Sequence, residues 1–370
     1  MTVSDDTHRD VRAGLSSYVG RTLPRHLSEV AQRFGARIGS PAYPQVDRNL
    51  DETSNAEQEL RDLGRALRER AAEAQIEMLI PGDDGWPTGT GCDELPCLWV
   101  QGDSDIAGLL HRAVTVTGSR ACSEYGRRVA CDLAEGLADG GWSLVTSLGH
   151  GVDAYAADAA LADAGARLVV VTADGLDTRH AESLESIRRR ALVAGAVVSA
   201  FPPGAEPIRK RILLRNHLLG TLAAASVIVA TPPVSDRMLV ARAANESGRV
   251  VCAVPGPVGS LDSAGCHQLI ADGTARLVTC AGDVIVAMAR HAHDRSSFHD
   301  SHLVRAVIRD SDGTARCQVP QFLVRAASHE HAANTAFDIL AGARPDPVHL
   351  ELGVYDHCGA YEAITIRTGR

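Results

Sequence analysis

Cations gather in one short stretch of a chain that is acidic as a whole. The segment R-K-R-I-L-L-R-N-H-L-L-G carries four cations in its first seven residues, although the formal net charge of the chain is -9. Arginine forks match the geometry of phosphate oxygens, and amide and imidazole groups can hydrogen-bond a phosphate or a sugar beside them. The candidate phosphate contacts are Arg209, Lys210, Arg211, Arg215, Asn216 and His217. A solvated charged face is the alternative interpretation.

The basic character extends beyond that segment. Residues 181–220 contain seven cations and three acids. The acidic balance of the whole chain argues against a protein that coats nucleic acid with its entire surface, but it is compatible with a local basic groove.

Two glycine-bearing loops offer further contacts for an anion. In V-T-V-T-G-S-R, Gly118 lets the backbone approach a ligand, Ser119 supplies a hydroxyl and Arg120 supplies a phosphate fork. In T-S-L-G-H-G-V-D, Gly149 and Gly151 keep the path free of side chains. Ordinary strand-to-helix turns are the alternative for both loops.

Asp153 follows the second loop at a position where two roles are possible. Its carboxylate could cap the next helix or accept a hydrogen bond from a sugar hydroxyl, and capping alone suffices to explain it. The neighbouring His150 is interpreted as an exposed loop histidine rather than a ligand-binding one.

The sequence predicts a binding site rather than a catalytic one. No nucleophile, base and orienting group occur together in a recognisable pattern, so we assign no catalytic residue, cofactor or metal. The nine cysteines include no C-x-x-C, and the cluster His291, His293, His299 and His302 is interpreted as a polar linker. Aromatic residues make up only 4% of the chain, so contacts to a nucleic-acid backbone would have to dominate. The candidates for stacking on bases are Tyr125, Tyr155 and Phe201.

The elements that position these residues alternate along the middle of the chain. Short Val-, Ile- and Leu-rich runs predict strands at 114–117, 143–146, 167–172, 196–200, 226–230, 249–254 and 276–279. Segments of helical period predict helices near 125–139, 153–164, 181–194, 216–224, 238–246 and 267–272. This alternation indicates a doubly wound, mostly parallel α/β sheet, in which ligands bind at the carboxyl ends of the strands.

Smaller units are expected on either side of the α/β region. We predict a helical module over 1–75, the α/β domain over 76–289, a His-rich linker over 290–303 and a small α+β unit of β-α-β-β order over 304–370. The first residues are acidic and polar, and no apolar run reaches the roughly 18 residues that span a bilayer. We therefore expect a cytoplasmic protein with no membrane partner.

Several short motifs, in order, resemble the DNA-processing protein A family (DprA or Smf). They include V-T-V-T-G-S-R, G-H-G-V-D-A-Y-A-A-D-A-A-L, L-L-R-N-H-L-L-G and S-A-G-C-H-Q-L-I-A-D-G-T-A, within a collinear match from Glu77 to Ala289. The resemblance implies an extended Rossmann fold, single-stranded DNA in a basic pocket, a homodimer and loading of the RecA recombinase. His217 stands where the family has a second arginine, which marks a divergent member.

A second class of function is kept beside the first. Rossmann-like enzymes that cleave nucleotides at the N-glycosidic bond resemble this fold, so a nucleotide or nucleotide-sugar sensor or a phosphoribohydrolase is the alternative. Those enzymes carry a Pro-Gly-Gly-x-Gly-Thr-x-x-Glu motif. The nearest text here, V-P-G-P-V-G-S-L-D-S-A-G, lacks both the threonine and the glutamate, and the missing acid weighs against catalysis.

Overall fold

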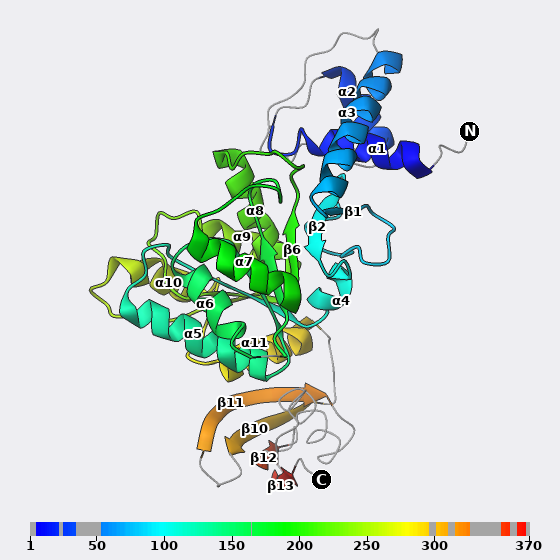
Figure 1. The fold of residues 1–370 in the computed structure, drawn as a ribbon. Coiled ribbons are helices and arrows are strands. Elements are labelled where there is room, and N and C mark those ends of the chain that lie inside the picture. The colour runs from blue at the N-terminus through cyan, green and yellow to red at the C-terminus, as the bar shows by residue number, and fades with distance from the viewer. Residues whose placement is uncertain are drawn as a thin grey trace.

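The computed structural model describes residues 5–21, 25–34, 53–163 and 165–295, together with four strands at 301–309, 315–325, 349–355 and 361–367. A nine-stranded sheet forms its centre (Figure 1). The strands are β1 Glu77–Leu79, β2 Leu98–Gly102, β3 Ala113–Thr117, β4 Ser143–Ser147, β5 Leu168–Val171, β6 Gly195–Ser199, β7 Ala225–Ile228, β8 Val250–Ala253 and β9 Arg276–Leu277.

The strands lie in the order β1-β2-β6-β5-β4-β3-β7-β8-β9. All pairs from β6 to β9 are parallel, whereas β1 pairs with β2, and β2 with β6, in antiparallel fashion. The chain winds outward from β3 in one direction and, after β6, from β7 in the other. This confirms the predicted doubly wound, mostly parallel class. The sequence pattern did not predict β1 and β2, because a loop rather than a crossover helix joins them.

Helices α5 Glu124–Asp139, α6 Val152–Ala160 and α7 Glu182–Ala194 lie in front of the sheet in Figure 1. The others around it are α4 Ile106–Leu110, α8 Arg209–Leu222, α9 Met238–Glu246, α10 Leu261–Ala271 and α11 Ala281–Arg295. Helix α8 begins at Arg209, not near Asn216 as predicted. Its first residues, R-K-R-I-L-L-R, contain no glycine or proline, and Arg, Lys and Leu are strong helix formers.

Two hydrophobic cores sandwich the sheet. In β5, Leu168 and Val170 belong to the core that includes α5, α6 and α7, whereas Val169 and Val171 belong to the core under α8, α9 and α10. All four side chains are fully buried. Because successive side chains of a strand point to opposite faces, a strand covered on both sides is apolar throughout. The uninterrupted apolar runs in the sequence reflect this double burial.

The N-terminal module consists of α1 Asp5–Ser16, α2 Arg25–Arg33 and α3 Thr53–Glu73. Helices α1 and α3 cross closely through two glycines. A Cβ on Gly14 would lie 2.2 Å from the carbonyl oxygen of Leu60, and one on Gly64 would lie 1.8 Å from that of Asp10. On α3, Leu60 and Ala71 are buried, whereas Leu63 is 36% exposed.

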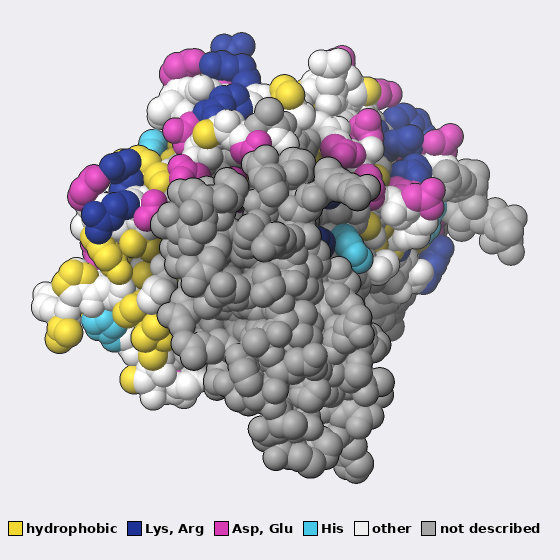
Figure 2. Space-filling view, turned by 90° about the horizontal axis from the view of Figure 1, so that it is seen from below, with side chains coloured by type: hydrophobic (Ala, Val, Ile, Leu, Met, Phe, Trp, Pro, Cys, Tyr) yellow, Lys and Arg dark blue, Asp and Glu magenta, His cyan; other side chains and the backbone are white. Residues whose placement is uncertain are grey.

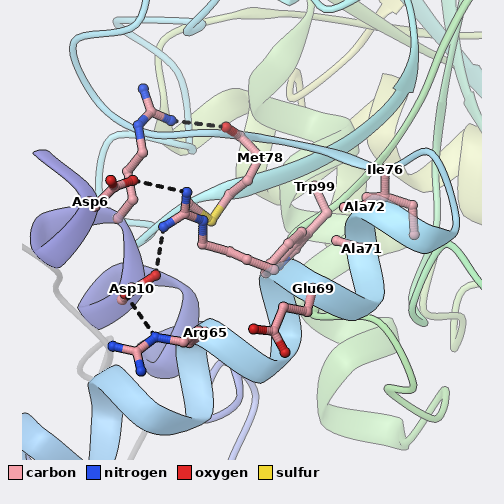
Figure 3. A pocket seen from close by; sticks show the side chains of 11 residues that line it. Asp6, Asp10, Arg65, Glu69, Ala71, Ala72, Ile76, Met78 and Trp99 are labelled. Atoms are coloured by element: carbon pink, nitrogen blue, oxygen red, sulfur yellow. Dashed lines mark hydrogen bonds and ion pairs between the residues drawn. The ribbon is translucent and has the colours of Figure 1, made fainter.

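Polar contacts join this module to the α/β domain. A pocket of about 610 Å³ lies between α1, α3 and the first two strands, and Figure 3 shows the acids of α1 beside the arginines of α3 there. Arg68 pairs with Asp10 at 2.6 Å and with Asp6 at 3.2 Å. The indole of Trp99 on β2 donates to Ser16 Oγ at 3.3 Å. The pocket is thus lined by ion pairs that are already complete.

A second sheet follows α11. Its strands, β10 Ser301–Arg309, β11 Ala315–Arg325, β12 His349–Tyr355 and β13 Tyr361–Arg367, lie in the antiparallel order β11-β10-β12-β13. Strand β11 and the β12–β13 hairpin match predicted strands, whereas β10 was not predicted. Part of the predicted linker is regular structure, since α11 runs to Arg295 and β10 begins at Ser301. The helix predicted over 328–342 lies outside the described residues.

Among the described residues, no helix combines the length and hydropathy needed to cross a bilayer. The free thiols within them are Cys92, Cys97, Cys122, Cys131, Cys252, Cys266 and Cys280, and four of them are buried.

Candidate functional site

The loop after β3 is held by backbone contacts on two sides. The amide of Ser119 donates to the carbonyl oxygen of Ala230 at 2.6 Å, and the amide of Val152 donates to that of Ser119 at 3.1 Å. A Cβ on Gly118 would lie 2.8 Å from Ala230 O. The predicted glycine-serine-arginine turn is therefore fixed between the end of β7 and the start of α6, with the side chain of Arg120 exposed.

Gly151 makes this arrangement possible. Its φ is 75°, and a Cβ there would lie 2.2 Å from Ser119 O and 2.4 Å from Arg120 O. Only glycine accepts both the backbone conformation and the close approach. Gly149 sits less tightly, with 3.0 Å between its virtual Cβ and Ser147 Oγ, and His150 between them is exposed, as predicted.

Asp153 is fully buried, which corrects both roles considered for it. Its Oδ1 accepts from Thr117 Oγ1 at 2.7 Å and from the amide of Gly118 at 3.3 Å, while its Oδ2 accepts from Ser147 Oγ and, at 2.8 Å, from Arg237 Nη2. It neither caps α6 nor reaches solvent, because the ends of β3 and β4 enclose it. Ser123, by contrast, caps α5, and its side chain accepts from the amide of Gly126.

Arg237, from the loop after β7, is the residue that sequence reasoning missed. It is 4% exposed and donates from Nε to Gly118 O at 3.0 Å and from Nη1 to Asn216 Oδ1 at 3.3 Å, besides its pair with Asp153. One guanidinium thereby links the loop after β3, helix α6 and helix α8. The strand-end rule that singled out the loops after β3 and β4 would have found it in T-P-P-V-S-D-R.

Arg215 lies next to this network and is buried; only 5% of it is accessible. Its Nε donates to Asn216 Oδ1 at 3.0 Å, and among the described residues its two terminal nitrogens have no acceptor. Burial lowers its pKa to about 9, and the charges of Arg237 and Arg120 act in the same direction. The site therefore holds more positive charge than its acids balance, which favours an anion.

The other cations of α8 divide by helical face. Arg209 and Lys210 are exposed, as a phosphate contact requires. Arg211 is only 2% exposed: it donates from Nη1 to Glu206 O at 2.8 Å, and its guanidinium lies 5.4 Å from the ring centroid of Phe201. Arg211 is thus bonded to its own loop and stacked on Phe201, and its contact with phosphate stays a prediction.

His217 and Phe201 also differ from what their types suggest. His217 is half-buried, and burial lowers its pKa, which favours the neutral imidazole. Phe201 is fully buried and unavailable for stacking, so that prediction is wrong. Tyr125 is half-buried, and its hydroxyl donates to Pro255 O, whereas Tyr155 is 40% exposed.

These residues meet where the winding of the sheet reverses. Strand β3 lies between β4 and β7, so the winding of the sheet reverses at β3 and the chain leaves the ends of β3 and β7 toward opposite faces. Open α/β sheets bind ligands at this switch point. Gly118 and Arg237 sit on its two sides.

Comparison with known proteins assigns the fold to a family. Residues 77–289 match the model of the family described as DNA recombination-mediator protein A. The chain belongs to this family.

Curated relatives carry names consistent with that assignment. The chain is 36% identical over 271 residues to a putative DNA processing protein DprA of Mycobacterium tuberculosis, covering 70% of this chain and 64% of the relative. It is 35% identical over 208 residues to protein Smf of Escherichia coli, covering 54% of each. The chain thus spans about two thirds or less of the length of these relatives, and neither carries the name of an enzyme.

Solved structures agree on the fold. DNA processing protein A of Streptococcus pneumoniae matches with a TM-score of 0.57 at 22% identity, covering 81% of this chain and 100% of that one. A Helicobacter pylori protein, whose structure is described as revealing the single-stranded DNA binding mode of DNA processing protein A, matches with a TM-score of 0.50 at 22% identity. It covers 57% of this chain and 94% of that one.

The described residues also contain a buried acid near Arg215 that was not predicted from the sequence. Asp174, after β5, is 3% exposed and lies 3.5 Å from His180 Nε2. Burial raises its pKa, while the nearby His180 opposes that effect. Ser199 Oγ donates to the main-chain oxygen of Asp174 at 2.7 Å, but in the described part of the chain no serine or cysteine is hydrogen-bonded to the Asp174 carboxylate or to the His180 ring. The Asp174 carboxyl also interacts electrostatically with Arg215.

Proposed function

We propose that this DNA-processing family member binds single-stranded DNA through its sugar-phosphate backbone at the carboxyl edge of the sheet. Arg215 holds one phosphate at the switch point, and Arg120, Arg209 and Lys210 hold neighbouring phosphates from the surface. The observation that carries the proposal is the side chain of Arg215, which is 5% accessible and whose two terminal nitrogens have no acceptor among the described residues. Neither nitrogen is fully enclosed by protein atoms, so both are open to a ligand.

The outer contacts make affinity depend on salt. If three to five phosphates are neutralised, log affinity should fall against log salt with a slope of about -2 to -3.5, since each contact on a single strand contributes roughly -0.7. The test is a titration of fluorescent oligothymidine at several salt concentrations. Replacing Arg209 and Lys210 together by Gln should reduce the slope by up to about 1.4.

A matched control is available at the opposite edge of the sheet. Arg167 is exposed and directly precedes β5, so Arg167→Gln removes one cation far from the carboxyl ends of the strands. For this variant, the slope of log affinity against log salt should equal that of the wild type. A loss of slope that is the same per removed charge in both variants would show that only net charge matters and would overturn the proposed contacts.

The alternative ligand, a mononucleotide or nucleotide-sugar, predicts a different pattern. It engages one or two phosphates, so its slope is shallow and it displaces the strand at low concentration. Adding mononucleotides as competitors in the same assay distinguishes a single-stranded DNA site from a mononucleotide site.

Three finer proposals rest on the resemblance to the family. We propose that the protein acts in DNA uptake or recombination by helping RecA onto the bound strand, that it is a homodimer, and that it works in the cytoplasm. The RecA proposal predicts that the wild type, but not Arg215→Gln, accelerates the strand-dependent ATPase of RecA on DNA covered by single-strand binding protein.

A further inference from the structure

A second pocket adjoins the proposed phosphate site. It has a volume of about 520 Å³ and lies between the loop after β3, helix α6 and the first turns of α7. Arg120 and the backbone of Gly151 line it, so the pocket lies directly beside Arg120, one of the proposed phosphate contacts. Its volume falls within the range of small-molecule sites.

One wall of the pocket is an aromatic ring. Tyr155, on α6, is 40% exposed, and its ring lines the pocket. The guanidinium of Arg127, on α5, lies 5.9 Å from the centroid of that ring. A base has a π-face that stacks on such a ring whatever its sequence.

The part of the lining that comes from α7 combines apolar and hydroxyl groups. Leu184 and Ile187 are buried and line the pocket, and beside them are the hydroxyls of Ser183 and Ser186. Among the described residues, neither hydroxyl makes a hydrogen bond. An apolar surface with a few free hydroxyls suits a flat heterocycle with donors and acceptors on its rim.

We propose that this pocket is a nucleobase subsite, in which a base of the bound strand stacks on Tyr155 while the adjoining phosphate is held by Arg120. The inference rests on the proposed function, because it places the base relative to a phosphate bound at the switch point. It adds a base-dependent contribution to binding that otherwise depends on the backbone.

The test compares two strands of equal length and backbone charge, oligothymidine and a fully abasic oligomer, on three proteins. The wild type should bind oligothymidine at least about five-fold more tightly than the abasic strand, the lower end of one stacked base. Tyr155→Ala should lose that preference, and Tyr155→Phe should retain it. Alanine is the best helix former, and the side chain is exposed, so the first variant should fold.

Control variants separate the two proposals. Val193→Ala, an exposed position at the other end of α7, should leave the preference unchanged. Arg215→Gln should weaken binding of both strands. If the wild type binds both strands equally and Tyr155→Ala does the same, the base subsite is wrong and the phosphate site stands. If the wild type binds neither strand, the proposed function itself fails.

A covalent readout locates the base directly. Oligonucleotides containing 5-iodouracil crosslink to nearby aromatic side chains on irradiation, and mass spectrometry should find the adduct on Tyr155. An adduct mapped only to α8 would overturn the subsite. A mononucleotide that binds the wild type but not Tyr155→Ala, and fully displaces the strand, would assign the pocket to a free nucleotide instead.

Discussion

Asp153 and Asp158 lie on the same helix, and each pairs with an arginine, yet their surroundings differ completely. Asp153 is fully buried with Arg237, whereas the side chains of Asp158 and its partner Arg190 are 63% and 42% exposed. Buried pairs leave an uncompensated charge when one partner is removed, while exposed pairs contribute little.

Replacing Asp153 by Asn should therefore lower the free energy of unfolding by about 3 to 5 kcal/mol, because Arg237 would stay buried without its counter-ion. Asp158→Asn, the matched control, should change it by less than about 1 kcal/mol. Urea denaturation followed by circular dichroism measures both. Equal changes in the free energy of unfolding would mean that the buried ion pair contributes no more to stability than the exposed one.

Asp174 makes stability depend on pH. Its pKa is raised by burial, so ionising it costs more in the folded than in the unfolded chain. The free energy of unfolding should fall as the pH rises from 3.8 through the raised pKa. Asp174→Asn should lack this fall, so the difference between variant and wild type in denaturation midpoint should grow with pH. Midpoints that change with pH in parallel for wild type and variant would contradict this role of Asp174.

At this scale the sequence predicted residue types better than their exposure. The sequence identified four residues of the candidate site by their type and spacing: Gly118, Arg120, Gly151 and Arg215. The burial of Arg215 could not be predicted from the sequence, because a cation in a helix is usually exposed. Here Arg215 is covered because α8 packs beside the loop that carries Arg237. Arg237 was missed because its partner is remote in sequence, 84 residues away.

At the scale of elements, the crossing of α1 and α3 depends on the missing side chains of two glycines. Alternating strands and helices predicted the middle of the chain well, because burial on both faces leaves a strong apolar signal. The antiparallel strands β1 and β2 left no such signal, and the start of α8 was missed because a charge run looked like a loop.

Gly64→Ala should destabilise the N-terminal module by about 1 to 3 kcal/mol, although alanine normally favours a helix, because the added carbon would overlap the carbonyl oxygen of Asp10. Gly165→Ala is the control: its new carbon would meet nothing closer than 3.7 Å. Thermal unfolding monitored by circular dichroism compares the two. A variant at position 64 as stable as the control would show that the helices can move apart.

At the scale of the whole molecule, charge is mixed rather than segregated on the face shown in Figure 2. Outside the grey residues, Lys and Arg side chains lie beside Asp and Glu side chains. Non-specific attraction of nucleic acid to this face is therefore weak, and the proposed site depends on the local excess of positive charge at the switch point.

The proposed homodimer can be tested at the edge of the sheet. Strand β9 is an edge strand, and Leu277 in it is 53% exposed. If this edge pairs two subunits, Leu277→Glu should convert a dimer into a monomer, because a charge would be buried in the interface. Light scattering at several concentrations measures the mass. A wild type that is monomeric at every concentration would rule the dimer out.

The pairing of Asp153 with Arg237 also has a consequence for the order of synthesis. A ribosome makes β3, β4 and Asp153 well before the loop after β7 exists. Until Arg237 emerges, the carboxylate at the end of β3 has no cationic partner, and the first half of the sheet has to keep it hydrated or leave that corner open. The phosphate site is therefore a late product of translation. A nascent chain arrested before residue 237 should be cut by proteases near 147–153, whereas one released after α9 should resist them.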